Sequence, residues 1–340
     1  MKIQSTITKI LDENTLYGDI FPNSSLDEIK SKYKEYCKIL HPDVCKDLRA
    51  DRAFSQLQVF YKQAKEAIQN NTWIATNYIE VSTKKETTLK IKYQYHCRFE
   101  LGDYYVCNKV IIYIFDDNRE KYYNNFIKQV NNLKYADRKM EKIFKNLFPK
   151  IQSISETTSG KKIVVLSKTE DIFPLKCLIE NGFNRNLPHT HLAWITSRLM
   201  NIACYLKWSG LVSNGIDIDN LFVSPHYHSI LLFGGWWYTT KANEAMIGTT
   251  KNIFNVMTPK VKANKVSDYT TDIESIRAIG RAYAAGDAPS AILNFYNEGS
   301  TNDSMKEMKK WDDALQKGYG VRRFVKINDN IINNIYKKGN

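Results

Sequence analysis

The chain has 340 residues, of which 43% are hydrophobic, and it carries a formal net charge of +13. This length is enough for two or three domains, each with its own core. No apolar run approaches the roughly 20 residues that cross a bilayer, so we expect no membrane partner. The N-terminus lacks an apolar segment of the signal-peptide type. The six cysteines form no CxxC pair, and we expect reduced thiols in a cytoplasmic protein.

Two amphipathic helices are predicted near the N-terminus. Apolar residues recur at helical spacing over residues 26–40 and again over residues 54–68. Ser25 and Glu28 form a capping box that begins the first helix. Pro42 ends it, because proline has no N–H to donate. Two such helices joined by a short polar loop predict an antiparallel hairpin.

The segment EIKSKYKEYCKILHPD, which ends in a His-Pro-Asp loop, resembles helix II and the following loop of the J-domain of Hsp70 co-chaperones. The resemblance covers residues 1–72. It implies that the loop contacts an Hsp70 or DnaK-type chaperone and stimulates its ATP hydrolysis. Three lysines before the loop lie four apart on one stripe, which suits an acidic partner. The alternative interpretation is a helix stop beside a solvated lysine face. The predicted Hsp70-binding residues are His41, Pro42, Asp43, Lys30, Lys34 and Lys38.

The rest of the chain changes from strands to helices. After a polar linker at 73–88, residues 90–115 alternate and predict three strands. A basic helix is predicted at 119–145, followed by two more strands, IQSISETT and KKIVVLSK. From about Pro188 the chain is mostly helical, and the apolar stretch HLAWITSRLMNIACYLKWSGLV predicts a buried helix.

Five strands with a helix after the third, followed by a helical half, resemble the two-lobed protein-kinase fold. The segment LVSNGIDIDNLFVSPHYHSILLFGG resembles the catalytic loop, strand pair and metal-binding turn of that family. The predicted fold class is therefore α+β. It comprises a J-domain hairpin in 1–72, a linker at 73–88 and a kinase-like domain at 89–340. The N-lobe would end at about residue 175 and the C-lobe would span 176–340.

The resemblance also implies that the catalytic groups are missing. Phosphoryl transfer depends on a few charged groups, and at their positions the chain has a tyrosine for the phosphate-binding lysine, a glycine for the catalytic base and a leucine for the principal magnesium ligand. Gly102 is the only glycine in the segment of the glycine-rich loop. We therefore expect no enzyme activity and no bound ATP or Mg²⁺. The matched positions are Tyr113, Gly215, Asn220, Leu232, Phe233, Gly234 and Asp272, the last being expected to accept backbone hydrogen bonds from the catalytic loop.

The sequence thus predicts a non-enzymatic adaptor, in which the J-domain recruits Hsp70 and the degenerate kinase-like domain binds an unknown client protein or complex. Two alternatives stay open. An atypical kinase would use Asp217 and Asp219 as displaced acids, although both are more simply interpreted as solvated loop residues. A nucleic-acid-binding protein would use the predicted basic helix at 119–145, which has eight basic and three acidic residues. A solvated lysine-rich face is the simpler interpretation of that helix.

Two histidine pairs and the tryptophans complete the candidate residues. His189-x-His191 and His226-x-His228 have a spacing that brings two imidazoles to one metal. Neither pair has a nearby cysteine or acidic ligand set in the sequence, and we expect no metal there. The six tryptophans are expected to fill the core or a face between domains.

Overall fold

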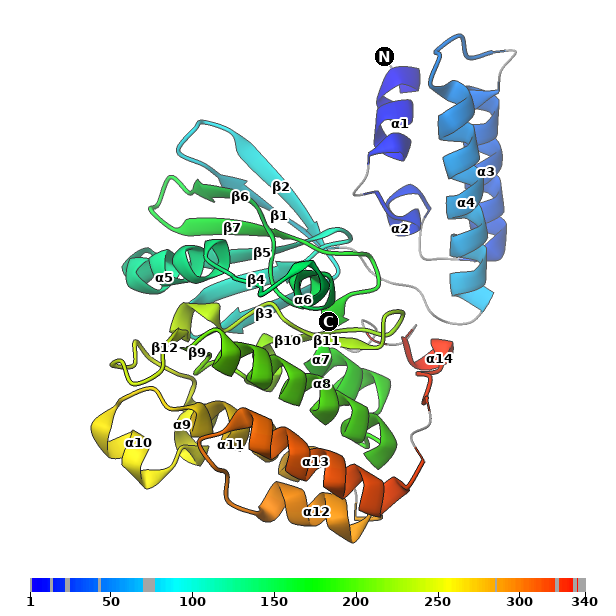
Figure 1. The fold of residues 1–340 in the computed structure, drawn as a ribbon. Helices are drawn as coiled ribbons and strands as arrows, with labels where there is room; N and C mark the ends of the chain where they lie inside the picture. Colours follow the sequence, from blue (N-terminus) through cyan, green and yellow to red (C-terminus); the bar gives the residue numbers. More distant parts are fainter. Residues whose placement is uncertain are drawn as a thin grey trace.

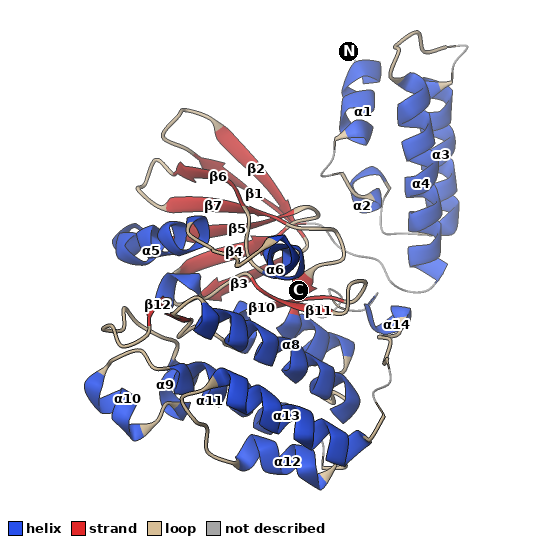
Figure 2. Ribbon diagram, in the orientation of Figure 1, coloured by secondary structure: helices blue, strands red, loops and turns tan. Residues whose placement is uncertain are grey.

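The computed structural model describes residues 2–12, 15–21, 25–41, 44–69, 77–284, 286–321, 324–332 and 335. It is a mixed α and β structure. A group of helices formed by the N-terminal residues stands beside a larger body, in which a sheet lies next to a helical half (Figures 1 and 2).

The two longer N-terminal helices form the predicted antiparallel hairpin, and two shorter helices pack against it. The helices are α1 (Lys2–Leu11), α2 (Tyr17–Ile20), α3 (Leu26–Leu40) and α4 (Ala50–Gln69). The predicted capping box at the start of α3 is confirmed, because the Ser25 side chain accepts from the Glu28 N–H at 3.2 Å. The buried stripe is rotated slightly from the predicted one: Leu26 is 39% exposed, whereas Phe60 is 5% exposed. The short helices α1 and α2 cover a face that periodicity within one helix cannot reveal.

The linker predicted at 73–88 is wrong over much of its length. Strand β1 (Asn77–Ser82) pairs antiparallel with β2 (Thr88–Tyr93). Ile79 and Val81 pack with Ile91 on one apolar cluster. The polar sequence STKKETT, which suggested a linker, contains the turn between these two strands. The hairpin is therefore part of the folded body.

A five-stranded antiparallel sheet in the order β3-β4-β5-β7-β6 forms the first half of that body. Only Gln94 separates β2 from β3, so no turn residue reveals that residues 90–115 contain most of β2 in addition to three further strands. A helical segment follows the third strand of this sheet, as predicted. The strands are β3 (Tyr95–Phe99), β4 (Gly102–Val106), β5 (Val110–Phe115), β6 (Ile151–Glu156) and β7 (Lys162–Ser167).

The basic helix predicted at 119–145 is two helices. The first, α5 (Glu120–Asn131), packs on the sheet side with Phe126 fully buried. The second, α6 (Arg138–Phe144), begins where the Asp137 side chain accepts from the Met140 N–H at 2.7 Å. Local capping therefore divides a segment that composition alone suggested to be continuous.

The helical half is built around α8 (His189–Trp208), whose burial the sequence predicted. Strand β8 (Phe173–Pro174) pairs with β10 (Leu221–Ser224), so the chain has already entered this half before the predicted boundary at 175. The remaining elements of this half are α7 (Leu175–Cys177), η3 (Leu178–Gly182), β9 (Leu211–Val212), η4 (Ile218–Asn220), β11 (Ser229–Leu232), η5 (Trp236–Tyr238), β12 (Thr240–Lys241), α9 (Lys251–Val256), α10 (Pro259–Asn264), α11 (Tyr269–Tyr283), α12 (Ser290–Asn297), α13 (Ser304–Tyr319) and α14 (Asp329–Ile332).

A buried ion pair ties three of these helices together. Arg277 of α11 and Glu307 of α13 are both fully buried and lie 2.5 Å apart. The Arg277 guanidinium also lies 4.5 Å from the ring centre of Phe295 in α12. Within the described ranges, no helix is long and apolar enough to cross a membrane. All six cysteines are free thiols.

Candidate functional site

Asp272 accepts backbone hydrogen bonds from the segment that resembles a catalytic loop. Its carboxylate accepts the N–H of Ser213 at 2.8 Å and the N–H of Asn214 at 3.1 Å. Asp272 is 2% exposed. Burial raises the pKa of this carboxyl to about 7, while the two backbone donors act in the opposite direction. The residue thus anchors the loop backbone from the first turns of α11.

Asn214 anchors the same segment from within. Its side-chain amide donates to the Tyr238 carbonyl at 3.2 Å and to the Ser267 hydroxyl at 2.9 Å. The side chain is fully buried. Sequence reasoning missed this residue, because an asparagine in a loop is usually a turn former and nothing nearby in the chain marks its partners.

Asn220, at the metal-ligand position, is engaged with backbone. Its side-chain amide donates to the Gly215 carbonyl at 3.0 Å. The backbone carbonyl of Asn220 accepts the Gly234 N–H at 3.0 Å. It is 5% exposed. The side chain that would ligate a metal therefore closes the loop that carries it.

The catalytic-base position has no room for a side chain. A Cβ atom on Gly215 would lie 2.6 Å from the carbonyl oxygen of Gly235. Gly235 has a φ of 81°, which favours glycine. The backbone after the degenerate metal-binding turn thus occupies the space in which an aspartate would have to stand.

Aromatic rings fill the space between sheet and helical half. Tyr113 is 1% exposed, and its ring lies 5.3 Å from that of Trp237 in η5. The ring centre of Trp237 lies 5.0 Å from that of Phe99 in β3 and 5.8 Å from that of Phe126 in α5. Leu232 is fully buried and Phe233 is 3% exposed. Tyr113, Leu232 and Phe233, which the resemblance matches to phosphate- and magnesium-binding positions, are therefore packed as core.

Trp237 also has a polar connection to α5. The side-chain amide of Asn125 donates to the Trp237 carbonyl at 3.0 Å and to the Thr239 carbonyl at 2.9 Å. The prediction that tryptophans fill the core is confirmed for Trp236, Trp237 and Trp311, whereas Trp208 is 49% exposed. The helix after the third sheet strand is therefore fixed against the helical half.

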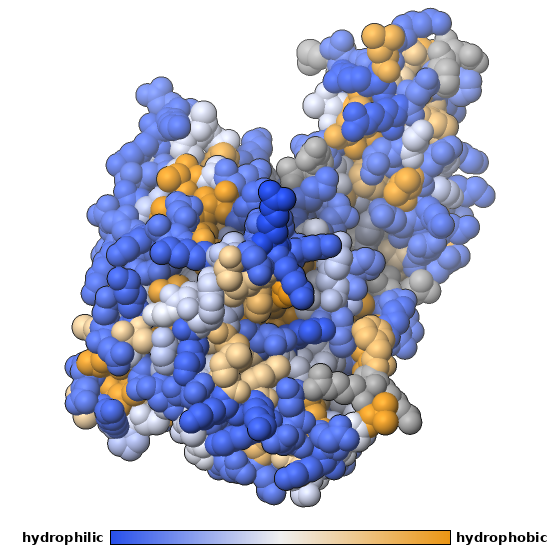
Figure 3. Space-filling model, viewed as in Figure 1, coloured by the Kyte–Doolittle hydropathy of each residue, from blue (hydrophilic) through white to orange (hydrophobic). Residues whose placement is uncertain are grey.

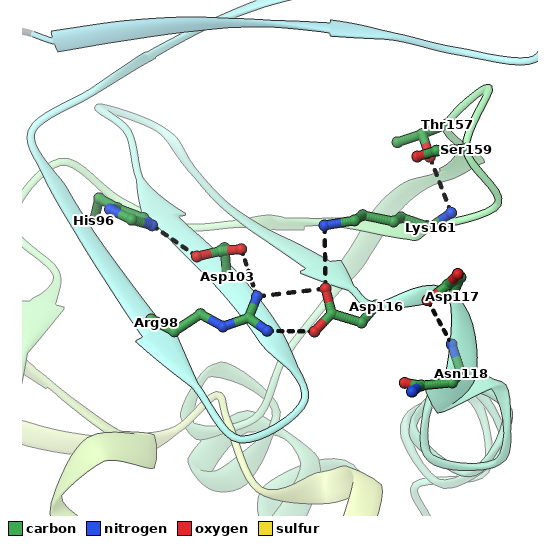
Figure 4. A network of polar contacts seen from close by, with 9 residues as sticks. All are labelled: His96, Arg98, Asp103, Asp116, Asp117, Asn118, Thr157, Ser159 and Lys161. Carbon is green, nitrogen blue, oxygen red and sulfur yellow. Dashed lines mark hydrogen bonds and ion pairs between the residues drawn. The ribbon is translucent and has the colours of Figure 1, made fainter.

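The position of a glycine-rich loop holds a tight turn. Strand β3 ends at Phe99 and β4 begins at Gly102, where an added Cβ would lie 1.9 Å from the Ile114 carbonyl oxygen. Figure 4 shows a polar network on this hairpin: Arg98 bridges Asp103, at 2.8 Å, and Asp116. Arg98 lowers the pKa of the Asp116 carboxyl.

The same network includes Lys161, which directly precedes β7, and His96 of β3. Asp116 accepts from Lys161 at 3.1 Å, and His96 contacts Asp103 at 2.9 Å. The Arg98 side chain is 55% exposed, so these pairs contribute little to stability. They join the hairpin of β3 and β4 to Asp116, the residue that follows β5.

The two acids proposed as replacements are both committed to structural contacts. The prediction of solvation is wrong for Asp217, which is 5% exposed and accepts from the Thr250 hydroxyl at 2.5 Å. It caps the short helix η4. The Asp219 side chain is 37% exposed and pairs with Lys176 at 2.7 Å. No local pattern predicts the Asp217 contact, because Thr250 lies 33 residues further along the chain.

The histidines of each predicted pair contact different partners rather than a shared site. His189 bonds to the Tyr319 hydroxyl at 2.8 Å, whereas His191 accepts from the Trp194 indole N–H at 3.1 Å. His228 contacts the Val325 carbonyl at 3.1 Å. Among the described residues, no group of three metal-ligating side chains comes together.

The predicted Hsp70-binding residues lie on and after α3. Lys30, Lys34 and Lys38 are exposed along this helix, and His41 is exposed at its C-cap. Pro42 and Asp43 lie outside the described residues. Tyr33 of α3 stacks on Tyr61 of α4 with ring centres 4.1 Å apart, which locks the two helices together on the side that faces the core.

No family model and no curated protein matches this chain. Its structure is similar to that of vaccinia related kinase 3, with a TM-score of 0.46 and 13% identity over 79% of this chain and 92% of that one. It is also similar to a rhoptry kinase from Toxoplasma gondii, with a TM-score of 0.48 and 8% identity over 74% of this chain and 86% of that one. The comparisons offer no support for a J-domain.

Proposed function

We propose that this protein is a non-enzymatic adaptor. Its N-terminal helices would act as a J-domain that recruits an Hsp70-type chaperone and stimulates its ATPase. Its kinase-like body would bind a client protein or complex and transfer no phosphate. The observation that carries the proposal is the α3–α4 hairpin, which presents a basic stripe beside His41.

The stripe lies on the face of α3 that the hairpin leaves open. Ile29 and Leu40 are fully buried against the other N-terminal helices, whereas Lys30, Lys34 and Lys38 are exposed. Exposed lysines at this spacing attract an acidic surface and speed association with it. Helix α3 ends at Leu40, so the histidine stands where a partner held by the lysines would also meet the loop.

The packed cleft supports the absence of phosphoryl transfer. An active site for this reaction needs preorganised charges at the transferring group. Here Tyr113, Gly215 and Leu232 supply none. Asp217 and Asp219, the displaced acids of an atypical kinase, already have structural partners. No contact in the described structure favours that alternative.

Single-turnover ATP hydrolysis by purified cytoplasmic Hsp70 and DnaK-type proteins tests the chaperone role. We expect the full chain to accelerate hydrolysis several-fold for at least one of them, and the substitution His41→Gln to abolish the effect. Replacing Lys30, Lys34 and Lys38 by Gln should weaken it, and salt should do the same, because exposed charges are screened.

The matched control removes charge from the second helix. Lys62 and Lys65 are exposed on α4, and their replacement by Gln should leave stimulation nearly unchanged. Equal stimulation by the parent chain and the His41→Gln variant, or no stimulation of any chaperone tested, would overturn the proposal. Circular dichroism of each variant separates lost function from lost folding.

A further inference from the structure

The described residues form a groove of about 940 Å³. It is bounded by the segment from α6 through η2 (Lys145–Leu147) to β6, by the connection that follows β7, and by the turn between β10 and β11. In Figure 1, α6 lies near the centre of the view, above β10 and β11. Figure 3 shows strongly hydrophilic side chains projecting beside paler and orange atoms in this central region.

The groove carries one sign of charge. Its lining residues, all within the described part of the chain, include Lys145, Lys150 and Lys168 and no acidic residue. Arg138 and Lys142 add exposed cations on α6. A groove lined by one sign of charge concentrates ligands of the opposite sign.

The carboxylates nearest to the groove are already engaged. Glu141 pairs with Lys145 at 3.7 Å. Asp171 accepts from the hydroxyl groups of Thr169, at 2.6 Å, and Ser224. These acids reduce the positive field at the rim without contributing to the lining. The groove therefore presents Lys150 to a ligand, together with Lys145 in its exposed pair with Glu141.

Lys168 is a buried cation in this lining. It is 8% exposed, and its ammonium group donates to the carbonyls of Asn108 at 2.7 Å and Thr169 at 3.2 Å. No carboxylate of the described residues forms an ion pair with it. Burial lowers the pKa of the Lys168 ammonium group to about 8, while the nearby carboxylates of Asp171 and Glu170 raise it. These acids offset part of the cost of burying the charge, and a carboxylate from a ligand would offset more of it. A lysine has three donors, so one remains for such a ligand.

The floor of the groove is apolar. Ile172, Leu231 and Phe233 line it and are nearly buried, while Ile143 is 55% exposed at the rim. The ring of Phe148, which also lines the groove, is held between Tyr205 at 4.5 Å and Trp236 at 5.2 Å. Stacking of successive nucleic-acid bases needs several accessible aromatic faces. Among the aromatic lining residues that the structure describes, only Tyr227 is largely exposed, at 65%. An apolar floor under a basic rim instead suits a peptide with mixed acidic and apolar side chains.

We propose that this groove binds an acidic peptide segment of a partner protein, with a carboxylate at Lys168 and an apolar side chain on the floor beside Ile172 and Leu231. The inference deepens the client-binding role given above, and it rests on that proposed function only in regarding the partner as a client. The chemistry of the groove is independent of the chaperone.

Selection of a random peptide library on the immobilised full chain tests the inference. We expect enrichment of peptides that combine Asp or Glu with Leu, Ile or Phe. An enriched peptide with a fluorescent label, followed by anisotropy, should bind about tenfold more weakly to the Lys145→Glu/Lys150→Glu variant, because like charges oppose binding. Lys168→Met should also weaken it, and the parent's affinity should fall with salt.

The matched control is Lys251→Glu/Lys260→Glu, which reverses two exposed lysines on α9 and α10, away from α6 in Figure 1. It should bind the peptide as the parent does. Absence of acidic enrichment, equal weakening by both double variants, or tighter binding of labelled oligothymidylate than of any peptide at the groove would overturn the inference.

The outcome is separable from that of the chaperone proposal. The groove variants should stimulate Hsp70 hydrolysis as the parent does, and the His41→Gln variant should bind the peptide as the parent does. Thermal unfolding of each variant verifies that the exposed substitutions leave the fold intact.

Discussion

Tyr113 and Trp237 meet edge to face, with ring centres 5.3 Å apart, at the junction of the sheet and the helical half. One stands where the resemblance places a phosphate-binding lysine, and the other follows the degenerate metal-binding turn. Both are 1% exposed. Two rings that pack in this way stabilise each other beyond the area they bury. The hydroxyl of Tyr113 is buried without a hydrogen-bond partner among the described residues. Burial raises the pKa of this hydroxyl.

Nucleotide should not bind to the packed cleft. Because the rings of Phe99, Tyr113 and Trp237 fill it, MgATP should leave the melting temperature of the full chain unchanged in differential scanning fluorimetry. Trp237→Ala should destabilise the body by about 3–5 kcal/mol, because it opens a large cavity. A saturable rise in melting temperature with MgATP would contradict this prediction.

Asp272 and Asp217 should both be needed for stability. Asp272→Ala leaves the N–H groups of Ser213 and Asn214 unpaired, at about 1–3 kcal/mol each when buried. Asp217→Ala removes a buried helix cap and the partner of Thr250, at roughly 1–2 kcal/mol. Chemical denaturation of the three single variants checks this. Asp219→Ala is the matched control and should cost less than about 1 kcal/mol, because its ion pair is partly exposed. Equal losses in all three would show that burial at these positions is unimportant.

Removing one partner of the buried ion pair should destabilise the protein more than replacing both partners by apolar residues. Arg277→Met removes the buried cation of Glu307 and leaves it only the partly exposed Lys310, at 3.0 Å, as an ion-pair partner. We expect a loss of about 3–5 kcal/mol. The double variant Arg277→Met/Glu307→Leu should recover part of this loss, since apolar residues need no counter-ion. Urea unfolding of the parent, both single variants and the double variant forms the required cycle. A double variant less stable than either single variant would refute the expectation.

His191 should make the protein sensitive to acid. Burial lowers its pKa from 6.5 to about 4, and in the neutral form it accepts the Trp194 indole N–H. Between these two pH values the unfolded chain binds the proton and the folded chain does not, so stability should fall as the pH decreases. His191→Gln should reduce the acid-induced drop in melting temperature between about pH 6.5 and about pH 4, measured against the parent. An unchanged drop would show that His191 does not contribute.

Local sequence determined the elements that depend on neighbours in the chain. The capping box of Ser25 and Glu28 begins α3 because both partners lie within one turn. Periodicity predicted the α3–α4 hairpin, because the spacing of apolar residues marks the buried face of each helix. The burial of α8 was predicted from the density of its apolar residues. The same local signals predicted a strand-rich segment followed by a helical one, but they did not reveal the β1–β2 hairpin or the division between α5 and α6.

Only the tertiary structure decided which of these positions form a site. The Gly215–Gly235 approach, the Thr250 contact to Asp217 and the ring packing on Trp237 join residues that are distant in the chain. In the sequence, Lys168 is one of many lysines and nothing near it in the chain indicates a role. The folded structure buries it in a groove that has no acidic lining residue. The spacing of residues in the sequence predicts contacts within one helix or strand. Burial and charge compensation arise only when separate elements pack, so the candidate sites of this protein depend on that packing.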